Sequence, residues 1–294
     1  MRILLVSDLH YTLPQLDWVV RAAPRFDLVV LAGDSLDISS AVPLDVQAVV
    51  ILRYLSLLKA AAPVVIASGN HDLTGPDEAG EQCALWLAGA RAAGVPTDGD
   101  SWRCGDTLVT VCPWWDGPLG RAALDAKLAA DALRRPARWL WVYHWPPLGS
   151  PTCWTGRRHY GDSELGGWIE RHRPDIVLAG HVHEPPFKPA GAWADRIGST
   201  WVFNAGRQIG PTPAHIAFHT GARQALWFSL AGSEMVDLDG GSAPEIRPLT
   251  ALPDWFANGR SLARPAPQAS RAPAAAHIST SASRSEPGAN SSSC

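Results

Sequence analysis

Five short apolar runs in the first 180 residues each end abruptly in a polar residue that could bind a metal ion or a ligand. They cover residues 3–6, 28–32, 64–67, 139–143 and 176–179, and a similar run lies at 108–112. Runs of four or five apolar residues between polar segments are typical of strands buried on both faces. The intervals between them are long enough for helices. The spacing therefore predicts a βαβ rhythm and an α/β fold.

Two of the intervals have helical periodicity. Residues 45–58 place four apolar side chains on or near one face: Val46, Val49, Val50 and Leu57. Residues 163–172 place Leu165, Trp168, Ile169 and His172 at helical spacing, with Ser163 as the expected N-cap. After residue 183 the pattern changes to strands at 201–203, 215–218 and 225–229, joined by turns rich in Gly and Pro. Parallel units followed by a meander fit two facing sheets with helices outside.

Composition is that of an ordinary globular protein and excludes few functions. Of the 294 residues, 46% are hydrophobic and 18% are charged, and the net charge of −3 does not suggest a nucleic-acid or membrane-surface binder. No apolar run approaches the ~18 residues of a spanning helix. The first apolar stretch ends at Ser7, too early for a secretory signal. We expect a cytoplasmic protein without a membrane partner.

The composition changes near residue 260. Residues 260–294 are mainly Ala, Ser and Pro, with too few large apolar groups to offset the entropy of ordering. This tail carries four arginines and one glutamate, so the remainder of the chain is mildly acidic, with a net charge of −6. We expect one folded domain over residues 1–259 and a disordered tail over 260–294.

The residues after the five strands form a set of metal-compatible donors. They are Asp8 and His10, Asp34, Asn70 with His71 and Asp72, His144, and His181 with His183. The carboxyl ends of parallel strands gather at one edge of a sheet, so these side chains should converge. A mixed oxygen and imidazole set suits Mn, Fe, Zn or Co better than Ca or Mg. There are too many donors for one ion and about enough for two.

Each motif alone has a structural alternative, such as a polar turn, a helix cap or a hydrogen-bonded histidine. In their order, however, "DLH", "GD", "GNHD", "YH" and "GHVH" resemble the calcineurin-like metallophosphoesterase superfamily, in particular its small bacterial-type phosphodiesterases. The resemblance covers residues 8–183, and "FNAGRQIG" is similar to the family's closing strand and turn. It implies a four-layer α-β-β-α sandwich of two mixed sheets flanked by helices.

The resemblance also implies a role for each donor. One divalent ion would be bound by Asp8, His10, Asp34 and His183, and the second by Asp34, Asn70, His144 and His181. Asp34 would bridge the two ions. His71 would face the leaving group without binding metal, Asp72 would orient His71, and Asp37 is either a supporting acid or a surface acid. The implied reaction is hydrolysis of a small phosphate ester, most simply a phosphodiester, by a hydroxide that bridges the ions.

Several choices stay open at this stage. Arg157 and His159, in the segment "CWTGRRHYGDSE", are candidate substrate contacts, although a solvated loop explains them equally well. Four tryptophans near the site loops could line a pocket or simply pack: Trp114, Trp115, Trp145 and Trp154. The rival functions are a DNA- or RNA-processing nuclease, disfavoured by the acidic body, and a non-catalytic metal-binding scaffold. The sequence does not fix the oligomeric state.

Overall fold

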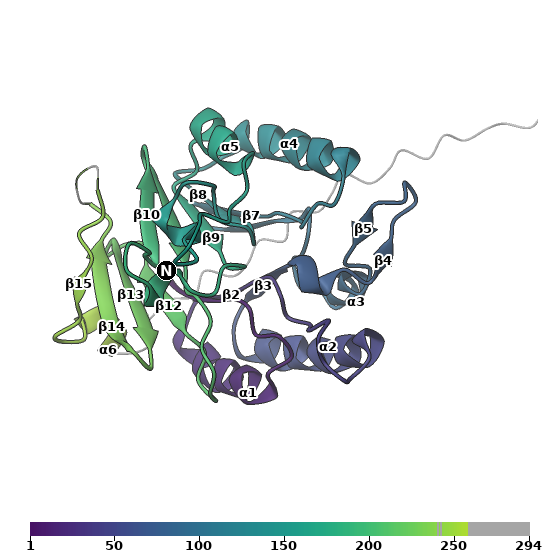
Figure 1. Cartoon of the computed structure of the whole chain (residues 1–294), viewed down its shortest axis with the longest axis horizontal. Coiled ribbons are helices and arrows are strands. Elements are labelled where there is room, and N and C mark those ends of the chain that lie inside the picture. The colour runs from purple at the N-terminus through teal and green to yellow at the C-terminus, as the bar shows by residue number, and fades with distance from the viewer. Residues whose placement is uncertain (240, 242, 258–294) are drawn as a thin grey trace, which may run out of the picture.

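Two β-sheets lie face to face in the middle of the molecule, with helices on both outer sides (Figure 1). The computed structural model describes residues 1–239, 241 and 243–257. In the first sheet the strand order is β15-β14-β13-β12-β1-β2-β3, and in the second it is β10-β11-β9-β8-β7-β6. Both sheets contain parallel and antiparallel pairs. The predicted four-layer sandwich of two mixed sheets is therefore confirmed.

The first sheet combines a parallel half with an antiparallel meander. Its strands are β1 (Arg2–Val6), β2 (Leu28–Ala32), β3 (Val64–Ala67), β12 (His215–His219), β13 (Gln224–Ser229), β14 (Gly232–Asp237) and β15 (Arg247–Pro248). The first three are parallel, and β12 pairs antiparallel with β1. The predicted strands at 3–6, 28–32 and 64–67 lie in this parallel half.

The second sheet has a parallel centre and antiparallel edges. Its strands are β6 (Ser101–Cys104), β7 (Thr107–Val111), β8 (Arg138–Val142), β9 (Ile176–Ala179), β10 (Ala194–Ile197) and β11 (Thr200–Asn204). Strands β7, β8, β9 and β11 run parallel, whereas β6 and β10 are antiparallel to their neighbours. A separate hairpin joins β4 (Gly75–Pro76) and β5 (Gln82–Cys83).

Helices cover the outer face of each sheet. On the first sheet lie α1 (Leu13–Ala22), α2 (Leu44–Ala61) and α3 (Leu87–Ala92), and on the second lie α4 (Pro118–Ala132) and α5 (Leu165–His172) (Figure 1). A last short helix is α6 (Asp254–Ala257). Short 3₁₀ turns occupy Ala23–Arg25, Asn70–Asp72, Pro151–Cys153 and Pro185–Phe187.

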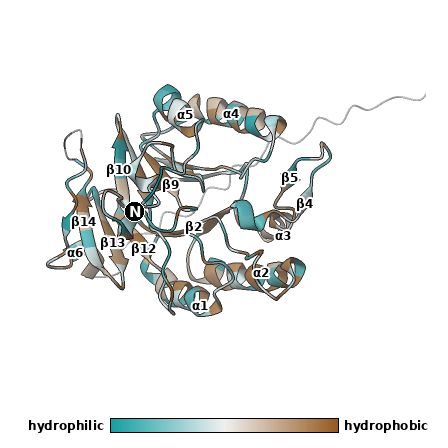
Figure 2. Cartoon of the chain, in the orientation of Figure 1, coloured by the Kyte–Doolittle hydropathy of each residue, from teal (hydrophilic) through white to brown (hydrophobic). Residues whose placement is uncertain are grey.

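Alternate residues of each strand enter different cores. Ile3 and Leu5 of β1 point between the sheets, whereas Leu4 and Val6 pack against the helices of the first sheet. Because both faces of these strands are buried, their sequences read as continuous apolar runs instead of alternating ones. Figure 2 shows hydrophobic strand segments between helices that carry both polar and apolar residues.

The two predicted helices exist, but the details of each differ from expectation. The exposed fractions of Val46, Val49 and Leu57 are 48, 68 and 38%, and α2 instead buries Gln47, Ala48, Ile51, Leu55 and Leu58. This helix is apolar on most sides, so its periodicity does not identify the buried face.

The expected cap of α5 is also different. The N-cap residue is Glu164, and its side chain makes no capping hydrogen bond. The Glu164 amide donates at 2.7 Å to the carboxylate of Asp162 and not to Ser163.

Two other expectations concern membrane-spanning helices and the C-terminal tail. Within residues 1–239, 241 and 243–257, no helix combines the length and hydropathy required to cross a bilayer. The expected disordered tail, 260–294, lies outside the described residues.

Candidate metal centre

The donors predicted from the sequence converge at the carboxyl ends of five strands. Their ligand atoms form three groups in which all atoms lie within 4.8 Å of one another: Asp8–His10–His183, His10–Asp34–His71 and Asp34–His144–His181. Asp8, His10, Asp34 and Asn70 follow strands of the first sheet, whereas His144, His181 and His183 follow strands of the second. The centre therefore lies where the edges of the two sheets meet.

Two carboxylates lie at the middle of this cluster. Asp34 Oδ2 is 3.2 Å from His144 Nε2 and 3.7 Å from His10 Nε2. Asp8 Oδ1 is 3.3 Å from His183 Nε2, and the Asp8 carboxylate also accepts a hydrogen bond from the His181 amide at 3.0 Å. Asp34 thus contacts both histidine groups, and Asp8 links the first sheet to the loop after β9.

Three buried side-chain atoms in the cluster have no hydrogen-bond partner among the described residues: Asn70 Oδ1, His144 Nε2 and His181 Nε2. In the neutral ring the other nitrogen of His144, Nδ1, donates to the Ala32 carbonyl at 2.6 Å, so the lone pair on Nε2 faces Asp34 Oδ2 at 3.2 Å. An unpaired buried polar atom costs roughly 1–3 kcal/mol. His144 and His181 share one ligand group with Asp34, and Asn70 precedes His71, whose amide donates to Asp34 Oδ1; a cation fits as the missing partner of these atoms.

The electrostatics of the cluster also favour bound positive charge. Burial alone would lower the pKa of His144, but the Asp34 and Asp8 carboxylates outweigh burial and raise that pKa to about 9. Burial would raise the pKa of Asp34, yet His144 keeps it below its ordinary value. Burial lowers the pKa of His10 and of His181 to about 4, so both imidazoles are neutral near pH 7. Neutral imidazoles and ionised carboxylates are the forms that bind metals, so a cation that binds at His144 would displace the proton that Asp34 and Asp8 stabilise on its ring.

The backbone leaves three of the five strands, β1, β2 and β9, through an unusual conformation. Four of the candidate ligands have positive φ angles: 54° at Asp8, 43° at His10, 53° at Asp34 and 65° at His181. Residues other than glycine rarely adopt this region, although Asp and His are enriched there, and each such residue costs about 1–3 kcal/mol. The turn directs the side chain away from the strand axis and into the cluster.

Glycines next to the ligands allow the loops to approach closely. A methyl group on Gly33, whose φ is +90°, would overlap the His144 ring. A methyl group on Gly69 would overlap Asp34 Oδ1 and lie 2.7 Å from the Asp34 backbone nitrogen. The glycines of "GD" and "GNHD" are therefore required by the packing of the centre itself.

A family model described as calcineurin-like phosphoesterase matches residues 1–185, a range that includes every candidate ligand. The chain belongs to the calcineurin-like phosphoesterase family. This membership supports a hydrolase acting on phosphate esters, and the family is dimetal-dependent, in keeping with the clustered Asp and His side chains. A comparison with curated proteins found no significant match.

Comparison with solved structures finds similar folds at low identity. TT1561 of Thermus thermophilus is 16% identical with a TM-score of 0.50, over 84% of this chain and 98% of that chain. A dimetal phosphatase from Danio rerio is 12% identical with a TM-score of 0.46, over 77% of this chain and 95% of that one. YfcE, a phosphoesterase from E. coli, is 14% identical with a TM-score of 0.35, over 85% of this chain and all of the other.

The histidine that this phosphoesterase places beside the ligands has a different partner from the one expected. His71 Nδ1 accepts a hydrogen bond from the Ile38 amide at 3.3 Å and lies 3.5 Å from Asp37 Oδ1. Asp37, expected only as a supporting or surface acid, is therefore the carboxylate next to His71.

The expected contact of Asp72 with His71 needs correction. The buried Asp72 carboxylate accepts hydrogen bonds from the amides of Ser35, Leu36 and Gly69 at 3.1, 2.9 and 2.9 Å. Burial and the nearby Asp34 carboxylate raise the pKa of Asp72 to about 7. Because Asp72 is the last residue of the 3₁₀ turn that begins at Asn70, its side chain can reach the Asp34 loop. It ties together the loops after β2 and β3.

Within their own loop, the side chain of His159 and the backbone of Arg157 are engaged in hydrogen bonds. His159 Nδ1 donates to the Ser150 carbonyl at 3.1 Å, and the Arg157 amide lies 3.4 Å from Thr155 Oγ1. Contact of Arg157 or His159 with a substrate stays a prediction.

Sequence reasoning missed an arginine at the centre. Arg207 Nε donates to the Asp8 carbonyl at 3.2 Å, and the Arg207 amide donates to the His183 carbonyl at 3.1 Å. The only sequence signal was its place in "FNAGRQIG", the segment after the last parallel strand. Arg207 joins the loops after β1 and β9 and brings a cation to the edge of the cluster.

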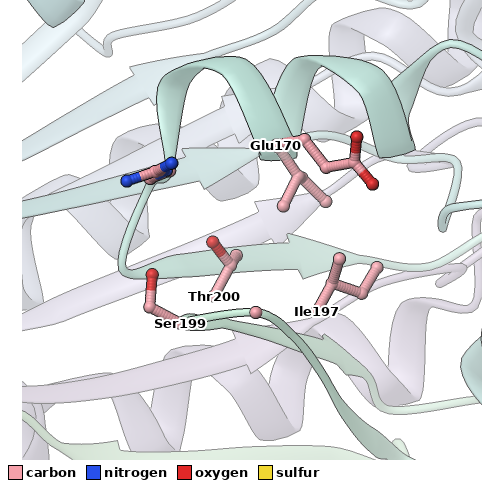
Figure 3. Close-up of a pocket in the computed structure, with 7 residues that line it drawn as sticks. Glu170, Ile197, Ser199 and Thr200 are labelled. Atoms are coloured by element: carbon pink, nitrogen blue, oxygen red, sulfur yellow. The ribbon is translucent and has the colours of Figure 1, made fainter.

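A surface cavity of about 470 Å³ lies elsewhere, between α5 and the turn that joins β10 to β11. In Figure 3, Glu170 lies on the helix above Ile197, Ser199 and Thr200. Residue Trp201, next to this cavity, pairs with Ile176 at the beginning of β9, whereas His181 follows the end of β9. The cavity is therefore at the opposite edge of the sheet from the metal centre.

Proposed function

We propose that the chain is a dinuclear metal-dependent phosphodiesterase. The observation that carries this proposal is the set of three buried, unpartnered atoms: Asn70 Oδ1, His144 Nε2 and His181 Nε2. Together with Asp34 they would form a mixed oxygen and imidazole shell for one divalent ion. Asp8, His10 and His183, again with Asp34, would hold a second ion. Asp34 would serve both sets, because its carboxylate lies near both histidine groups.

The two ions, when bound, would lower the pKa of a coordinated water toward ~7 and stabilise negative charge on phosphate oxygens. The ligands contribute two buried carboxylates, Asp8 and Asp34. Two divalent cations therefore leave the centre with net positive charge, which attracts an anionic phosphate ester. The identity of the metals is left to experiment among Mn, Fe, Zn and Co.

We assign His71 as the group that donates a hydrogen bond to the departing oxygen and, when its ring is protonated, a proton. Its Nδ1 accepts a hydrogen bond from the Ile38 amide, so in the neutral ring the proton is on Nε2. The His71 ring lies edge-on to His10, with 4.4 Å between ring centroids, so it borders the ligand cluster. The Asp37 carboxylate lies 3.5 Å from Nδ1 and places negative charge beside the ring. Proton donation by a positioned side chain contributes about 10²–10⁴-fold in rate.

The decisive experiment is a substrate panel with the manganese-loaded full chain. It compares aryl phosphodiesters, the matching monoesters, cyclic nucleotides and single- and double-stranded DNA. We expect the highest kcat/KM for a small diester. Preferred cleavage of DNA would favour the nuclease alternative, and absence of any hydrolysis in the presence of two bound ions would favour the scaffold.

Three variants separate the proposed roles. His71→Ala should lower kcat at least 100-fold while metal analysis still finds two ions per chain, because His71 is not assigned as a ligand. Asn70→Ala should lose one ion. The control is His219→Ala, since His219 pairs with Arg2 at the opposite end of β1 from Asp8. Full activity in His71→Ala would contradict its role as proton donor.

A further inference from the structure

Three aromatic rings from three different segments surround the imidazole of His181. Trp114 follows β7, Trp145 follows β8, and Tyr160 comes from the loop before α5. Their ring centroids lie 5.1, 5.3 and 5.3 Å from that of His181. We call these three residues the aromatic wall. The wall borders the proposed second ion, because His181 is one of its assigned ligands.

The wall lies outside the buried core, although Trp145 packs against the edge of the core of the second sheet. Tyr160 is 42% exposed, and Trp114 and Trp145 are half-buried. Tryptophans that only pack, such as Trp139 and Trp141, are completely buried. Aromatic area left in water beside a polar centre is unfavourable, and a ligand that covers it gains the free energy of its burial.

Hydrogen bonds fix the wall in position. The Trp145 indole N–H donates to the Tyr160 carbonyl at 3.3 Å, and the Trp114 amide donates to Ser68 Oγ at 2.9 Å. Trp114 and Trp145 stack on each other with 5.1 Å between centroids and 22° between planes. A wall that is already ordered loses little conformational entropy when a ligand stacks on it.

Polar groups at the edge of the wall fit the periphery of a planar, anionic ligand. In the described part of the chain, no residue accepts a hydrogen bond from the Trp114 indole N–H, which leaves a donor for a ligand. The Arg158 guanidinium lies over the Tyr160 ring, 5.3 Å from its centroid, and brings positive charge to the outer edge. Trp115 and Trp154 have other partners, Tyr143 Oη and the Pro189 carbonyl, and do not join the wall.

The wall and His71 lie next to different ligands. His71 lies beside His10, whereas the wall surrounds His181. A phosphodiester carries two substituents on phosphorus, so one can leave toward His71 while the other rests on the wall. We propose that the aromatic wall binds a planar aromatic ring, a nucleobase or an aryl group, in the ester substituent that stays on the phosphate. This inference rests on the proposed phosphodiesterase function.

The test compares ligands that differ only in the ring, using binding to the manganese-loaded full chain measured by calorimetry. Adenosine 5′-monophosphate is paired with ribose 5-phosphate, and phenyl phosphate with methyl phosphate. Stacking of a base on an aromatic side chain predicts at least about tenfold tighter binding of the ring-bearing member. The pair with the larger ratio distinguishes a nucleobase from a simple aryl group.

Variants test whether the preference for ring-bearing ligands depends on the aromatic wall. Tyr160→Ala should reduce the ratio to about two or less, and Tyr160→Phe should keep it, because Phe retains the ring. Trp154→Ala is the matched control, since Trp154 lies in the same segment and its ring, among the residues that the structure describes, contacts no aromatic ring other than that of His159. Its ratio should equal that of the wild type.

Two results would overturn the inference. One is equal affinity for both members of each pair in the wild-type protein. The other is that Tyr160→Ala weakens both members of a pair equally and also loses metal, since the wall would then only support His181. Because binding is measured without turnover, a ring preference in a protein that hydrolyses no phosphate ester would contradict the proposed function and leave the wall intact.

Discussion

His215 gives the fold a pH dependence that does not involve the metal centre. It is the first residue of β12, only 8% exposed, and its ring stacks on Phe228 and contacts Trp18. Its Nδ1–H donates to the Pro213 carbonyl at 3.0 Å. Burial lowers the pKa of His215 from 6.5 to about 4.

The sign and size of the effect follow from proton binding. Between pH 6.5 and 4 the unfolded chain binds a proton at this histidine and the folded chain does not. Lower pH therefore favours unfolding, and the stability present above pH 6.5 is lost as the pH falls toward 4. The difference between a pKa of 6.5 in the unfolded chain and about 4 in the folded chain, at ~1.36 kcal/mol per pH unit, corresponds to about 3 kcal/mol.

The measurement is urea denaturation of the wild type and His215→Gln in the presence of a chelator, at intervals from pH 7.5 to 4. Glutamine can still donate to the Pro213 carbonyl but does not titrate. The free energy of unfolding of the wild type should fall relative to the variant by about 3 kcal/mol over this range. Parallel curves would mean that the folded protein accommodates a charged imidazole at this position, and the reasoning from burial would be refuted.

Three further substitutions test the supports of the centre and of the fold. Gly69→Ala should keep the circular dichroism spectrum but lose at least one bound ion by metal analysis, because the new methyl group would overlap Asp34. Asp72→Asn should lower the free energy of unfolding by about 2 kcal/mol and weaken metal binding at least tenfold by calorimetry, because an amide cannot accept from all three backbone donors; unchanged metal affinity would exclude a bracing role. Asp131→Asn should cost about 3 kcal/mol in urea denaturation, since this buried carboxylate accepts from two hydroxyl groups and pairs with Lys127 and Arg134; a loss below about 1 kcal/mol would contradict this.

The central strands could be predicted from the sequence because they are buried on both faces. Few other structures produce uninterrupted apolar runs, and such runs form most of the length of five strands: β1, β2, β3, β8 and β9. The edge strands β6 and β10 are partly exposed and carry polar residues, so their sequences do not differ clearly from loops. The buried side of α2 depends on Gln47, whose carboxamide bonds the Asp37 backbone. A polar residue with a specific buried partner cannot be recognised from periodicity.

Convergence of the donors could be predicted because it depends on topology, which the order of the motifs reflects. The hydrogen-bond partner of each supporting side chain could not be predicted from the sequence. Asp72 follows His71 directly, yet its carboxylate is bound by amides 36 and 37 residues earlier in the chain. Arg207 reaches Asp8 across 199 residues. Such contacts depend on the path of loops whose sequences have no regular pattern.

The position of the centre between the two sheets has a consequence for folding. Its proposed ligands span residues 8–183, and neither sheet alone supplies a complete set for either ion. Cations can therefore gain high affinity only after the two halves of the sandwich have met, which requires many long-range contacts. Metal binding should therefore stabilise the folded state without accelerating folding. Burial of the apolar strands must bring the two halves together without help from the ions.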